Sequence, residues 1–422
     1  MVQYKRYEEY KDSVVEWIGE VPAYWNLSNL RYLCRIETGS KDTQDNTEEG
    51  QYPFFVRSQV VERIDEYTHD DEAVMTAGDG AGVGKVFHYY KGKFASHQRV
   101  YIFTKFRRCT AKFLFYYLKS NLAFEVLKWN AKSTVDSLRR PMLTGFVVSL
   151  PSLSEQNAIT NFLDQRTAEI DSHITDKEKL ISLLDEQRQA IITEAITKGL
   201  NPNVKMKDSG VEWIGTIPEH WEIKKIKHKF TIQKRIVPQD DPTVLSLTQR
   251  GLKIKDLEDF SGQHAESYSN YQLVNKNDFV MNSMDLLTGF VDCSPFIGVT
   301  SPDYRVFTQN NPDECHQYFL YYFQKCYFEK IFYGHGQGVS KFGRWRLQTD
   351  VFKEFPVMIP PVEEQFEIAR TVSSKINDID EVIQRNIELI DKLKEYRQSL
   401  IFEAVTGKID VRDVAVEKTE TA

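Results

Sequence analysis

The stretch KDSVVEWIGEVPAYW, from Lys11 to Trp25, recurs as KDSGVEWIGTIPEHW from Lys207 to Trp221. Two tryptophans, a glycine and a proline keep the same offsets in both copies. Because such residues are rarely matched by chance, the recurrence indicates a duplicated structural unit. The length of 422 residues also exceeds what one hydrophobic core usually supports. We therefore expect two domains that share one fold.

A second pair of matching blocks closes each copy. LPSLSEQNAI, residues 150–159, matches IPPVEEQFEI, residues 359–368. From there the copies run without a gap to EAITKG, residues 194–199, and EAVTGK, residues 403–408. No Gly or Pro interrupts either interval before its closing glycine, which predicts one continuous helix in each. Each repeat thus has a constant opening, a divergent middle and a constant helical end.

Both predicted helices carry an apolar seam with the a/d spacing of a coiled coil. The seam residues are Leu163, Ile170, Ile174, Ile181, Leu184, Ile191 and Ala195 in the first helix, and Val372, Ile379, Ile383, Ile390, Leu393, Leu400 and Ala404 in the second. At about 1.5 Å per residue each helix is on the order of 65 Å long, too long to bury its seam in one small domain. We expect the two seams to pack on each other; the alternative is that each packs on its own domain's core.

Chain connectivity sets the direction of that helix pair. The first helix leads from the first domain to the second, where the second helix begins, so a paired arrangement is antiparallel. This predicts a dumbbell with a pseudo-twofold axis, one domain at each end. We expect Trp17, Trp25, Trp213 and Trp221 to anchor each opening motif where the long helix of the other repeat finishes. An aromatic ligand cage is the alternative for these tryptophans.

The divergent middles combine apolar alternation, typical of strands, with the blocks FLFYYL and FLYYF, which predict short buried helices. They share a weaker echo: AVMTAG, residues 73–78, with FVMNSM, residues 279–284, and Arg99 with Arg305. The expected fold class is α+β, with two similar mixed α/β domains separated by an antiparallel pair of long helices. The expected boundaries are 1–152 for the first domain, 153–199 for the first long helix, 200–361 for the second domain, 362–408 for the second long helix and 409–422 for a disordered tail.

The charge of the chain is unevenly distributed. A formal net charge of -7 argues by itself against a nucleic-acid partner. The segment from Lys91 to Arg140, however, carries twelve Lys and Arg against two acidic residues, and it follows an acidic segment. Because local charge governs such binding, the segment predicts a basic surface for nucleic acid; a solvated surface with uneven charge is the alternative.

Cysteine spacing and hydropathy indicate the compartment. Five cysteines are scattered without a C-x-x-C pair, which favours reduced thiols over a disulfide framework or a zinc site. The start of the chain lacks the apolar block of a signal peptide, and no run approaches the length of a membrane helix. We expect a cytoplasmic protein with no membrane partner.

Motifs of catalysis are missing from the sequence. AGDGAGVGKVF, residues 77–87, fails the phosphate-loop pattern, because Asp79 stands where a glycine is required and Val86 where Ser or Thr is required. No metal-ligand spacing and no nucleophile motif is found, so no catalytic or metal-binding residue is predicted. We expect these glycines to let the backbone approach a ligand, with Lys85 nearby; a flexible hairpin is the alternative.

Two loops in equivalent places carry residues suited to DNA recognition. WNAKSTVDSLRR, residues 129–140, and YGHGQGVSKFGRWRL, residues 333–347, combine cations with amide or hydroxyl side chains. Arg and Lys bind phosphates or guanine edges, and Gln reads adenine. The predicted DNA-binding residues are Lys85, Lys132, Arg139 and Arg140 in the first domain, and Gln337, Lys341, Arg344 and Arg346 in the second. A plain surface loop is the alternative for each.

The opening motifs, the two closing blocks and the junction EAITKGLNPNVKMKDSGVEWIG together resemble the specificity (S) subunit of type I restriction-modification systems. The resemblance covers nearly the whole chain. It departs mildly from the repeat pattern at Val14, which stands where the second copy has Gly210, and at Ser152 and Ser154.

The resemblance implies two target recognition domains that each read one half of a bipartite site in double-stranded DNA, with the helices as spacer. It also implies a non-catalytic subunit that docks two methylation subunits and, in the full complex, restriction subunits. S-adenosylmethionine, ATP and Mg are then expected on those partners and not on this chain. The competing hypotheses are a non-catalytic two-headed protein scaffold and, more distantly, a diverged methyltransferase.

Overall fold

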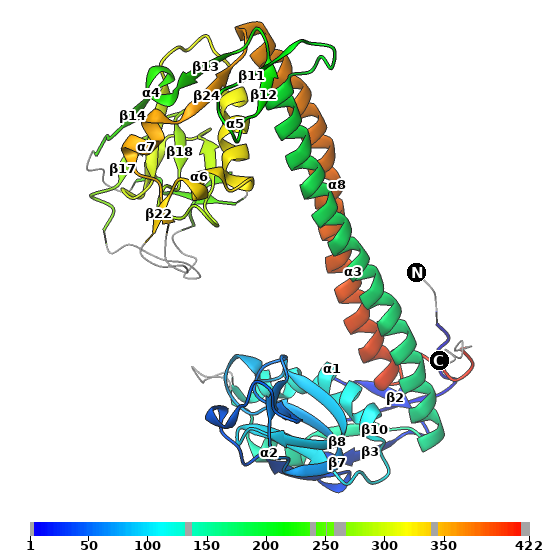
Figure 1. Ribbon diagram of the computed structural model, residues 1–422. Coiled ribbons are helices and arrows are strands. Elements are labelled where there is room, and N and C mark those ends of the chain that lie inside the picture. Colours follow the sequence, from blue (N-terminus) through cyan, green and yellow to red (C-terminus); the bar gives the residue numbers. More distant parts are fainter. Residues whose placement is uncertain are drawn as a thin grey trace. The chain divides into compact units, whose positions relative to one another are not determined.

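The computed structural model describes residues 4–130, 137–236, 242–249, 251–256, 267–338 and 345–414, without the side chains of residues 127–130. The chain forms two compact units. The first unit consists of Met1–Lys177 and Ile387–Ala422, and the second unit of Glu178–Asn386. The boundary between them falls inside both long helices, so each unit contains one part of each helix (Figure 1).

The two long helices are α3, Leu153–Lys198, and α8, Val362–Val405. In the first unit Arg397 Nη2 on α8 lies 3.0 Å from Asp171 Oδ2 on α3. In the second unit Arg188 Nε on α3 lies 3.8 Å from Asp380 Oδ1 on α8. Arg188 and Asp171 hold the places in the first repeat that Arg397 and Asp380 hold in the second. The same ion pair therefore joins the two helices in each unit.

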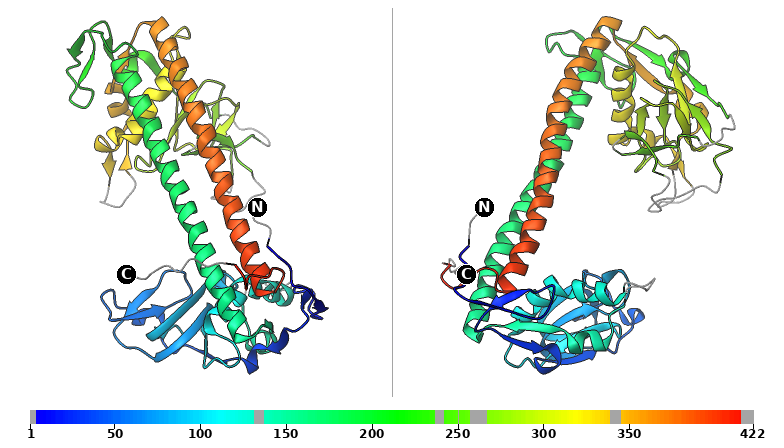
Figure 2. Two further views of the ribbon diagram at one scale, coloured as in Figure 1. Left: turned by 90° about the vertical axis from the view of Figure 1, so that its right-hand side faces the viewer. Right: turned by 180° about the vertical axis from the view of Figure 1, so that it is seen from behind.

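The helices are antiparallel within each unit. In the first unit Ser149, just before α3, donates a hydrogen bond to the carbonyl of Val405 at the end of α8. Farther along α3, Asp171 meets Arg397, which lies earlier on α8. Both views of Figure 2 show α3 and α8 side by side. The expected antiparallel coiled pair is confirmed.

Burial is uneven along the seam, and Ile170, Ile174, Ile379 and Ile390 are 6–9% exposed. Leu163, Val372, Leu400 and Ala404 are at most 2% exposed, whereas Ile181, Leu184, Ile383 and Leu393 are only half-buried. The outer parts of the helices also pack on the domain core, since Ile192, Ile196, Ile368 and Val372 belong to the core cluster of the second unit. Of the seam residues, Ala195 and Val372 belong to this domain core, as the alternative expected.

The domain of the first unit is built on a six-stranded sheet. Its order is β4 (Arg35–Thr38), β9 (Val100–Thr104), β7 (His69–Ala77), β8 (Phe87–Ser96), β5 (Tyr52–Phe55) and β6 (Glu62–Ile64). All neighbours are antiparallel except β5 and β8. Helix α1, Ala111–Asn130, contacts β7 and β8.

Short elements complete the first unit. They are β1 (Tyr10–Asp12) paired with β2 (Glu20–Pro22), β3 (Asn26–Asn29) paired with β10 (Val147–Leu150), the 3₁₀ helices η1 (Leu30–Tyr32), η2 (Thr43–Asp45) and η3 (Gly80–Gly82), and α2 (Arg140–Gly145). Because β3 precedes the divergent middle and β10 follows it, the middle enters and leaves through adjacent antiparallel strands.

The domain of the second unit repeats this plan with a smaller central sheet. The four-stranded sheet has the order β14 (Phe230–Gln233), β21 (Arg305–Gln309), β18 (Phe279–Met281) and β19 (Val291–Cys293). The remaining strand pairs are β11 (Met206–Asp208) with β12 (Thr216–Pro218), β13 (Glu222–Lys225) with β24 (Pro356–Ile359), β15 (Leu245–Thr248) with β16 (Gly251–Ile254), β17 (Gln272–Val274) with β20 (Gly298–Thr300), and β22 (Gln337–Gly338) with β23 (Trp345–Arg346). The helices are α4 (Ile226–Lys229), α5 (His316–Phe328), α6 (Ile331–Gly334) and α7 (Thr349–Glu354).

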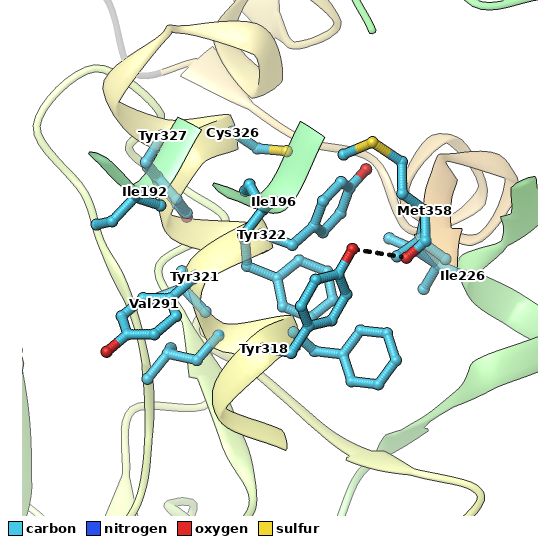
Figure 3. Packing of buried hydrophobic residues seen from close by; sticks show 14 of the residues in the cluster. Ile192, Ile196, Ile226, Val291, Tyr318, Tyr321, Tyr322, Cys326, Tyr327 and Met358 are labelled. Atoms are coloured by element: carbon cyan, nitrogen blue, oxygen red, sulfur yellow. Dashed lines mark hydrogen bonds between the residues drawn. The ribbon is translucent and has the colours of Figure 1, made fainter. Parts of the chain in front are cut away.

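Helix α5 attaches the second domain to α3 (Figure 3). Tyr318 and Tyr322 are fully buried and belong to one apolar cluster with Ile192 and Ile196 of α3. The Tyr318 hydroxyl donates a hydrogen bond of 3.3 Å to the carbonyl oxygen of Met358. Apolar burial and a satisfied hydroxyl together hold the domain on the helix. The mixed α/β fold class is confirmed, and the FLFYYL and FLYYF blocks are helical as predicted.

The strand registers show which residues of the two domains are equivalent. In the first unit Val74 pairs with Phe103 between β7 and β9. In the second unit Phe279 pairs with Phe307 between β18 and β21. The outer strands β4 and β14 pair with the same two phenylalanines through equivalent isoleucines. Phe103 and Phe307 therefore hold the same place in the fold, and Val74 matches Phe279.

These registers correct the predicted echo between the middles. AVMTAG and FVMNSM correspond with a shift of one residue, because Val74 and not Ala73 matches Phe279. Two residues before the equivalent Phe103 and Phe307 stand Tyr101 and Arg305. Arg305 is therefore equivalent to Tyr101, and its predicted match with Arg99 is wrong by two residues. Short apolar runs align equally well in neighbouring registers, whereas the hydrogen-bonded ladder admits one.

Each opening motif lies at the end of the long helix from the other repeat. In the first unit a Cβ on Gly407, just after α8, would lie 2.4 Å from Pro22 Cδ and 3.1 Å from the ring of Trp25. In the second unit Gly199, just after α3, lies in the same way against the ring of Trp221. Trp25 and Trp221 are fully buried. The predicted anchoring is confirmed for these tryptophans, which are core residues.

A glutamate in the first turn of each long helix completes this junction; it is buried in the first helix and half-buried in the second. Glu155 Oε1 accepts hydrogen bonds from Tyr7 Oη at 2.9 Å, Tyr24 Oη at 2.9 Å and Trp25 Nε1 at 3.2 Å. The equivalent Glu364 accepts one from Trp221 Nε1 at 3.1 Å and faces His220 at 2.7 Å. Each opening motif is therefore bonded to the start of its own helix and packed on the end of the other.

One turn of the opening motif differs in residue type between the copies. Val14 has a φ of 60°, and Gly210 at the equivalent place has a φ of 72°. The backbone N–H of Val14 donates to Asp12 Oδ1 at 2.8 Å, and that of Gly210 to Asp208 Oδ1 at 2.9 Å. The turn is the same in both, but a β-branched residue is strained in the left-handed region.

Residues 409–411 are packed, although they fall in the segment expected to be a disordered tail. Ile409 and Val411 are buried, and Asp410 bridges to Lys5. All five cysteines are free thiols. Within the described part of the chain, no helix has the length and apolar character needed to cross a membrane.

Candidate nucleic-acid interface

In the first unit, the predicted DNA-binding segment meets the predicted glycine loop. The backbone N–H of Leu138 donates to the carbonyl of Gly78 at 2.8 Å, and Ser137 forms a β-bridge with Asp79. This pairing brings the start of α2 next to the end of β7. Arg139 and Arg140 follow at once, and both are exposed.

The glycines of that loop are explained mainly by packing. A Cβ on Gly82 would lie 2.6 Å from the carbonyl oxygen of Arg57, and one on Gly84 would lie 3.3 Å from Ala123 Cα. Gly80 has a φ of 74° and open space around it. Only Gly80 is therefore free for the close approach to a ligand that the sequence suggested. Lys85, which follows the loop, is exposed.

A cluster of ion pairs lies at the base of the loop. Asp79 accepts from Arg57 Nη1 at 2.9 Å and from Arg99 Nη1 at 2.6 Å. Burial alone would raise the pKa of Asp79, but the two guanidinium groups hold it below its usual range. Two arginines share one carboxylate, so the cluster keeps a positive charge beside Ser137.

Arg140 borders a cationic cavity of about 420 Å³. Its Nη2 donates to the carbonyl of Ile36 at 3.1 Å, which places the side chain along the edge of β4. Arg31 and Arg35 also line the cavity, and Glu37 is its acidic residue, paired with Arg35 at 2.9 Å. Burial raises the pKa of the nearby Tyr101, and the positive charge of Arg140 opposes that shift. The cavity therefore has an excess of positive charge.

Part of the basic segment is neutralised by the fold. Lys105 pairs with Asp71 at 2.5 Å, and Lys112 pairs with Asp164 of α3. The positive surface expected from residues 91–140 is consequently smaller than the sequence suggested. What remains near the loop is the group formed by the exposed Lys85, Arg139 and Arg140.

In the second unit, two of the predicted residues are paired across a hairpin. Gln337 of β22 is directly opposite Arg346 of β23, and both are exposed. Gly338 lies under the ring of Trp345, where a Cβ would be 2.8 Å from Trp345 Cδ2. The ring of Tyr333 lies 4.9 Å from that of Trp345. The glycine thus allows an aromatic support beneath the pair. The predicted residues Lys132, Lys341 and Arg344 lie outside the described residues.

Sequence reasoning missed Arg305. It lines a cavity of about 190 Å³ together with Lys234 and Arg346. Arg305 is 6% exposed, and its guanidinium lies 4.5 Å above the centre of the Phe352 ring. Its Nη2 donates to the carbonyl of Leu347 at 2.8 Å. The misaligned match with Arg99 hid this residue, because Arg99 is exposed on its domain.

Comparison with known proteins places these features in a family. The sequence model of the type I restriction modification DNA specificity domain matches residues 22–181 and again residues 218–391. The chain is 24% identical over 419 residues to the type I restriction enzyme EcoDI specificity subunit of Escherichia coli, covering 93% of this chain and 90% of that protein. It is 24% identical over 426 residues to the type I restriction enzyme MjaVIII specificity subunit of Methanocaldococcus jannaschii, covering 93% and 95%.

A solved structure has a similar fold. It belongs to work on the complex assembly and conformational transition of the type I R-M system, and it matches with a TM-score of 0.64 at 13% identity, over 91% of this chain and 98% of that chain. The family matches fall on both repeats and together span more than half of the sequence. The chain therefore belongs to the family of type I restriction-modification DNA specificity proteins.

Proposed function

We propose that each domain of this specificity protein reads one half of a bipartite site in double-stranded DNA. One observation carries the proposal: the same domain is built twice on equivalent registers, while the residues around its exposed loops differ. Constant packing with divergent polar and charged loops is what two readers of different sequences require. The protein itself is the recognition subunit and not an enzyme, as its family shows.

The proposed contacts to DNA are the exposed side chains at the two loops. Arg139 and Arg140 in the first domain, and Gln337 and Arg346 in the second, are exposed on adjoining backbone segments. Guanidinium groups form paired hydrogen bonds with guanine, and the Gln amide forms them with adenine. Lysines bind phosphates without sequence preference. Lys85, Lys132, Lys341 and Arg344 are included in the proposal.

The long helices are proposed as the spacer between the two reading heads. Helix α3 has 46 residues and α8 has 44. At about 1.5 Å per residue these correspond to lengths on the order of 65–70 Å. Ion pairs and buried seams hold the helices together in each unit. A stiff pair of this kind would make the gap between the two half-sites a matter of geometry.

The partners are proposed from the relatives, which are specificity subunits of type I restriction enzymes. We expect the chain to dock two methylation subunits and, in the full complex, restriction subunits in the cytoplasm. S-adenosylmethionine would then be bound by the methylation subunits, and ATP and Mg by the partners as well. The chain contributes the DNA sequence preference of that complex.

The test is to co-express the chain with its methylation subunit and map modified bases across a genome by direct sequencing. The expected result is a bipartite motif with a constant gap. Arg139→Ala and Gln337→Ala form a matched pair: each should relax one half of the motif, at a cost of about 1–3 kcal/mol, and leave the other half unchanged.

Random or absent modification from an assembled complex that binds S-adenosylmethionine would contradict the proposal. That outcome would favour the two-headed protein scaffold, because a scaffold has no preference among DNA sequences. A motif whose two halves both relax in either variant would contradict independent reading by the two domains.

A further inference from the structure

The second unit contains a small cavity with an excess of positive charge. The cavity of about 190 Å³ lies between the ends of β14, β21 and β23 and has room for about six water molecules. Three cations line it, namely Lys234, Arg305 and Arg346, against one carboxylate, Asp303. Ser283 and Thr349 add hydroxyl groups. Such a lining suits an anion that accepts several hydrogen bonds.

Arg305 is buried in this cavity without a carboxylate partner among the described residues. Besides the carbonyl of Leu347, its Nη2 reaches only the Thr349 hydroxyl, at 3.5 Å. Burial lowers the pKa of Arg305 to about 10, and the positive charge of Arg346 acts in the same direction. The guanidinium thus stays charged at neutral pH. A buried charge is costly unless it is paired, and two adjacent guanidinium groups repel each other.

The nearby carboxylates do not relieve this excess. Asp278 is bonded to Arg235 at 2.6 Å, which satisfies both charges. Asp303 is exposed, so its charge is screened by water. Among the described residues no further carboxylate pairs with Arg305 or Arg346, so the cavity suits an anion that enters from outside.

The first unit places a guanidinium at the same junction by a different route. Leu138 and Leu347 donate backbone hydrogen bonds to equivalent carbonyls, those of Gly78 and Ser283. Two residues later α2 begins with Arg140, and α7 begins with a threonine. On the neighbouring strand the first unit has a tyrosine where the second has its buried arginine.

In the first domain the helix supplies the arginine, Arg140, and the strand supplies an uncharged residue. In the second domain the strand supplies the arginine, Arg305, and the helix supplies an uncharged residue. A guanidinium group that only stabilised the fold would not need to occur at this place in both domains when a different element supplies it in each. A guanidinium that contacts the same ligand in both domains would need to be in this place, whichever element supplies it. The common feature of any two DNA half-sites is the phosphate backbone.

We propose that this cavity of the second domain binds one backbone phosphate of the DNA half-site, held by Arg305, Arg346 and Lys234. Arg140 has the corresponding role in the first domain. The assignment rests on the proposed function and adds a fixed anchor to it. A phosphate contact of this kind sets the position of the domain on the duplex and leaves base reading to the hairpin of Gln337.

The experiment measures DNA binding by the full chain in complex with its methylation subunit, as a function of salt, on a duplex that contains the mapped site. Arg305→Met removes the charge and keeps an apolar stem over Phe352, while Arg305→Lys restores the charge. Lys234→Gln tests the same cavity at an exposed residue, so that a folding defect at Arg305 does not end the test. Lys224→Gln on β13, outside the cavity, is the matched control.

Loss of one phosphate contact should lower the slope of log affinity against log salt by about 0.9, so the advantage of the wild type over Arg305→Met should shrink about 3.5-fold between 50 and 200 mM salt. Arg305→Lys and Lys224→Gln should keep the wild-type slope. A duplex with a single neutral methylphosphonate should identify the phosphate: one position weakens wild-type binding and has no effect on Arg305→Met.

The proposal is overturned if Arg305→Met, Arg305→Lys and Lys234→Gln all keep the wild-type slope and no methylphosphonate position depends on Arg305. Arg305 would then be a structural clamp, or the cavity would hold a free anion. If the wild-type complex has no preference among DNA sequences, the proposed function is refuted. If the wild-type complex keeps its sequence preference but the salt slopes of the variants equal that of the wild type, only the phosphate site is refuted.

Discussion

Exchanging the two turn residues of the opening motifs should change stability in opposite directions. Val14 occupies the left-handed region with a φ of 60°, where the second copy has Gly210 with a φ of 72°. An L-residue pays about 1–2 kcal/mol in this region, and Val, being β-branched, lies toward the upper end. The side chain of Val14 is 90% exposed, so its removal loses almost no apolar burial.

We therefore expect Val14→Gly to stabilise the first unit. Glycine has more conformational freedom than valine in the unfolded chain, which stabilises the unfolded state. This effect cancels about 0.5–1 kcal/mol of the stability gained by relieving the backbone strain. The net gain is about 1 kcal/mol, or a rise of roughly 2–4 °C in the melting temperature of a unit of this size. The hydrogen bond from the backbone N–H to Asp12 is kept, because it does not involve the side chain.

The reverse change supplies the matched control. A Cβ on Gly210 would meet nothing within 4 Å, so Gly210→Val introduces backbone strain without a steric clash. It should destabilise the second unit by about 1 kcal/mol. Urea and calorimetric unfolding of the full chain would measure both variants, with separate transitions assigned to the two units if they appear. A loss of stability in Val14→Gly, or none in Gly210→Val, would refute the reasoning from backbone strain.

The other predictions concern the helix junctions and the spacer. Glu155→Ala should cost about 2–4 kcal/mol in urea unfolding, because it leaves the buried donors of Tyr7 and Trp25 without an acceptor. Glu364→Ala should cost about half as much, because Glu364 accepts from one buried donor, Trp221, and its other neighbour, His220, is exposed to water. Equal losses of stability in the two variants would contradict this account. Deleting one matching heptad from both α3 and α8 shortens the pair by about 10.5 Å, so the gap in the methylated motif should shrink by about three base pairs; an unchanged gap would refute the spacer role.

The parts of the fold that sequence predicted are those with long or costly patterns. Apolar residues at intervals of three and four over forty-odd positions, without Gly or Pro, fit only a helix among the regular secondary structures. The structure has the two predicted helices, α3 and α8. The paired tryptophans of the opening motif predicted a core junction for the same reason, since large aromatic rings at fixed offsets are rarely left exposed.

The parts that sequence missed depend on register and on contacts between distant segments. A strand of three to five residues carries too little pattern to fix its alignment, so Arg305 was matched with Arg99 and its cavity stayed hidden. The proximity of Gln337 and Arg346 could be predicted from the sequence, because both belong to one glycine-rich segment. The burial of Arg305 could not be predicted, because Lys234 comes from one distant segment of the chain and Leu347 and Phe352 come from another.

The adjacent entry and exit strands of each divergent middle have a consequence for inheritance. In the first unit β3 pairs with β10, and in the second β13 pairs with β24, so the two ends of each middle lie side by side in the constant frame. A recombination event that replaces the whole middle between these strands leaves the helices and their junctions intact. New recognition can then spread by exchange of one intact domain between genes, and the other half of the site stays as it was.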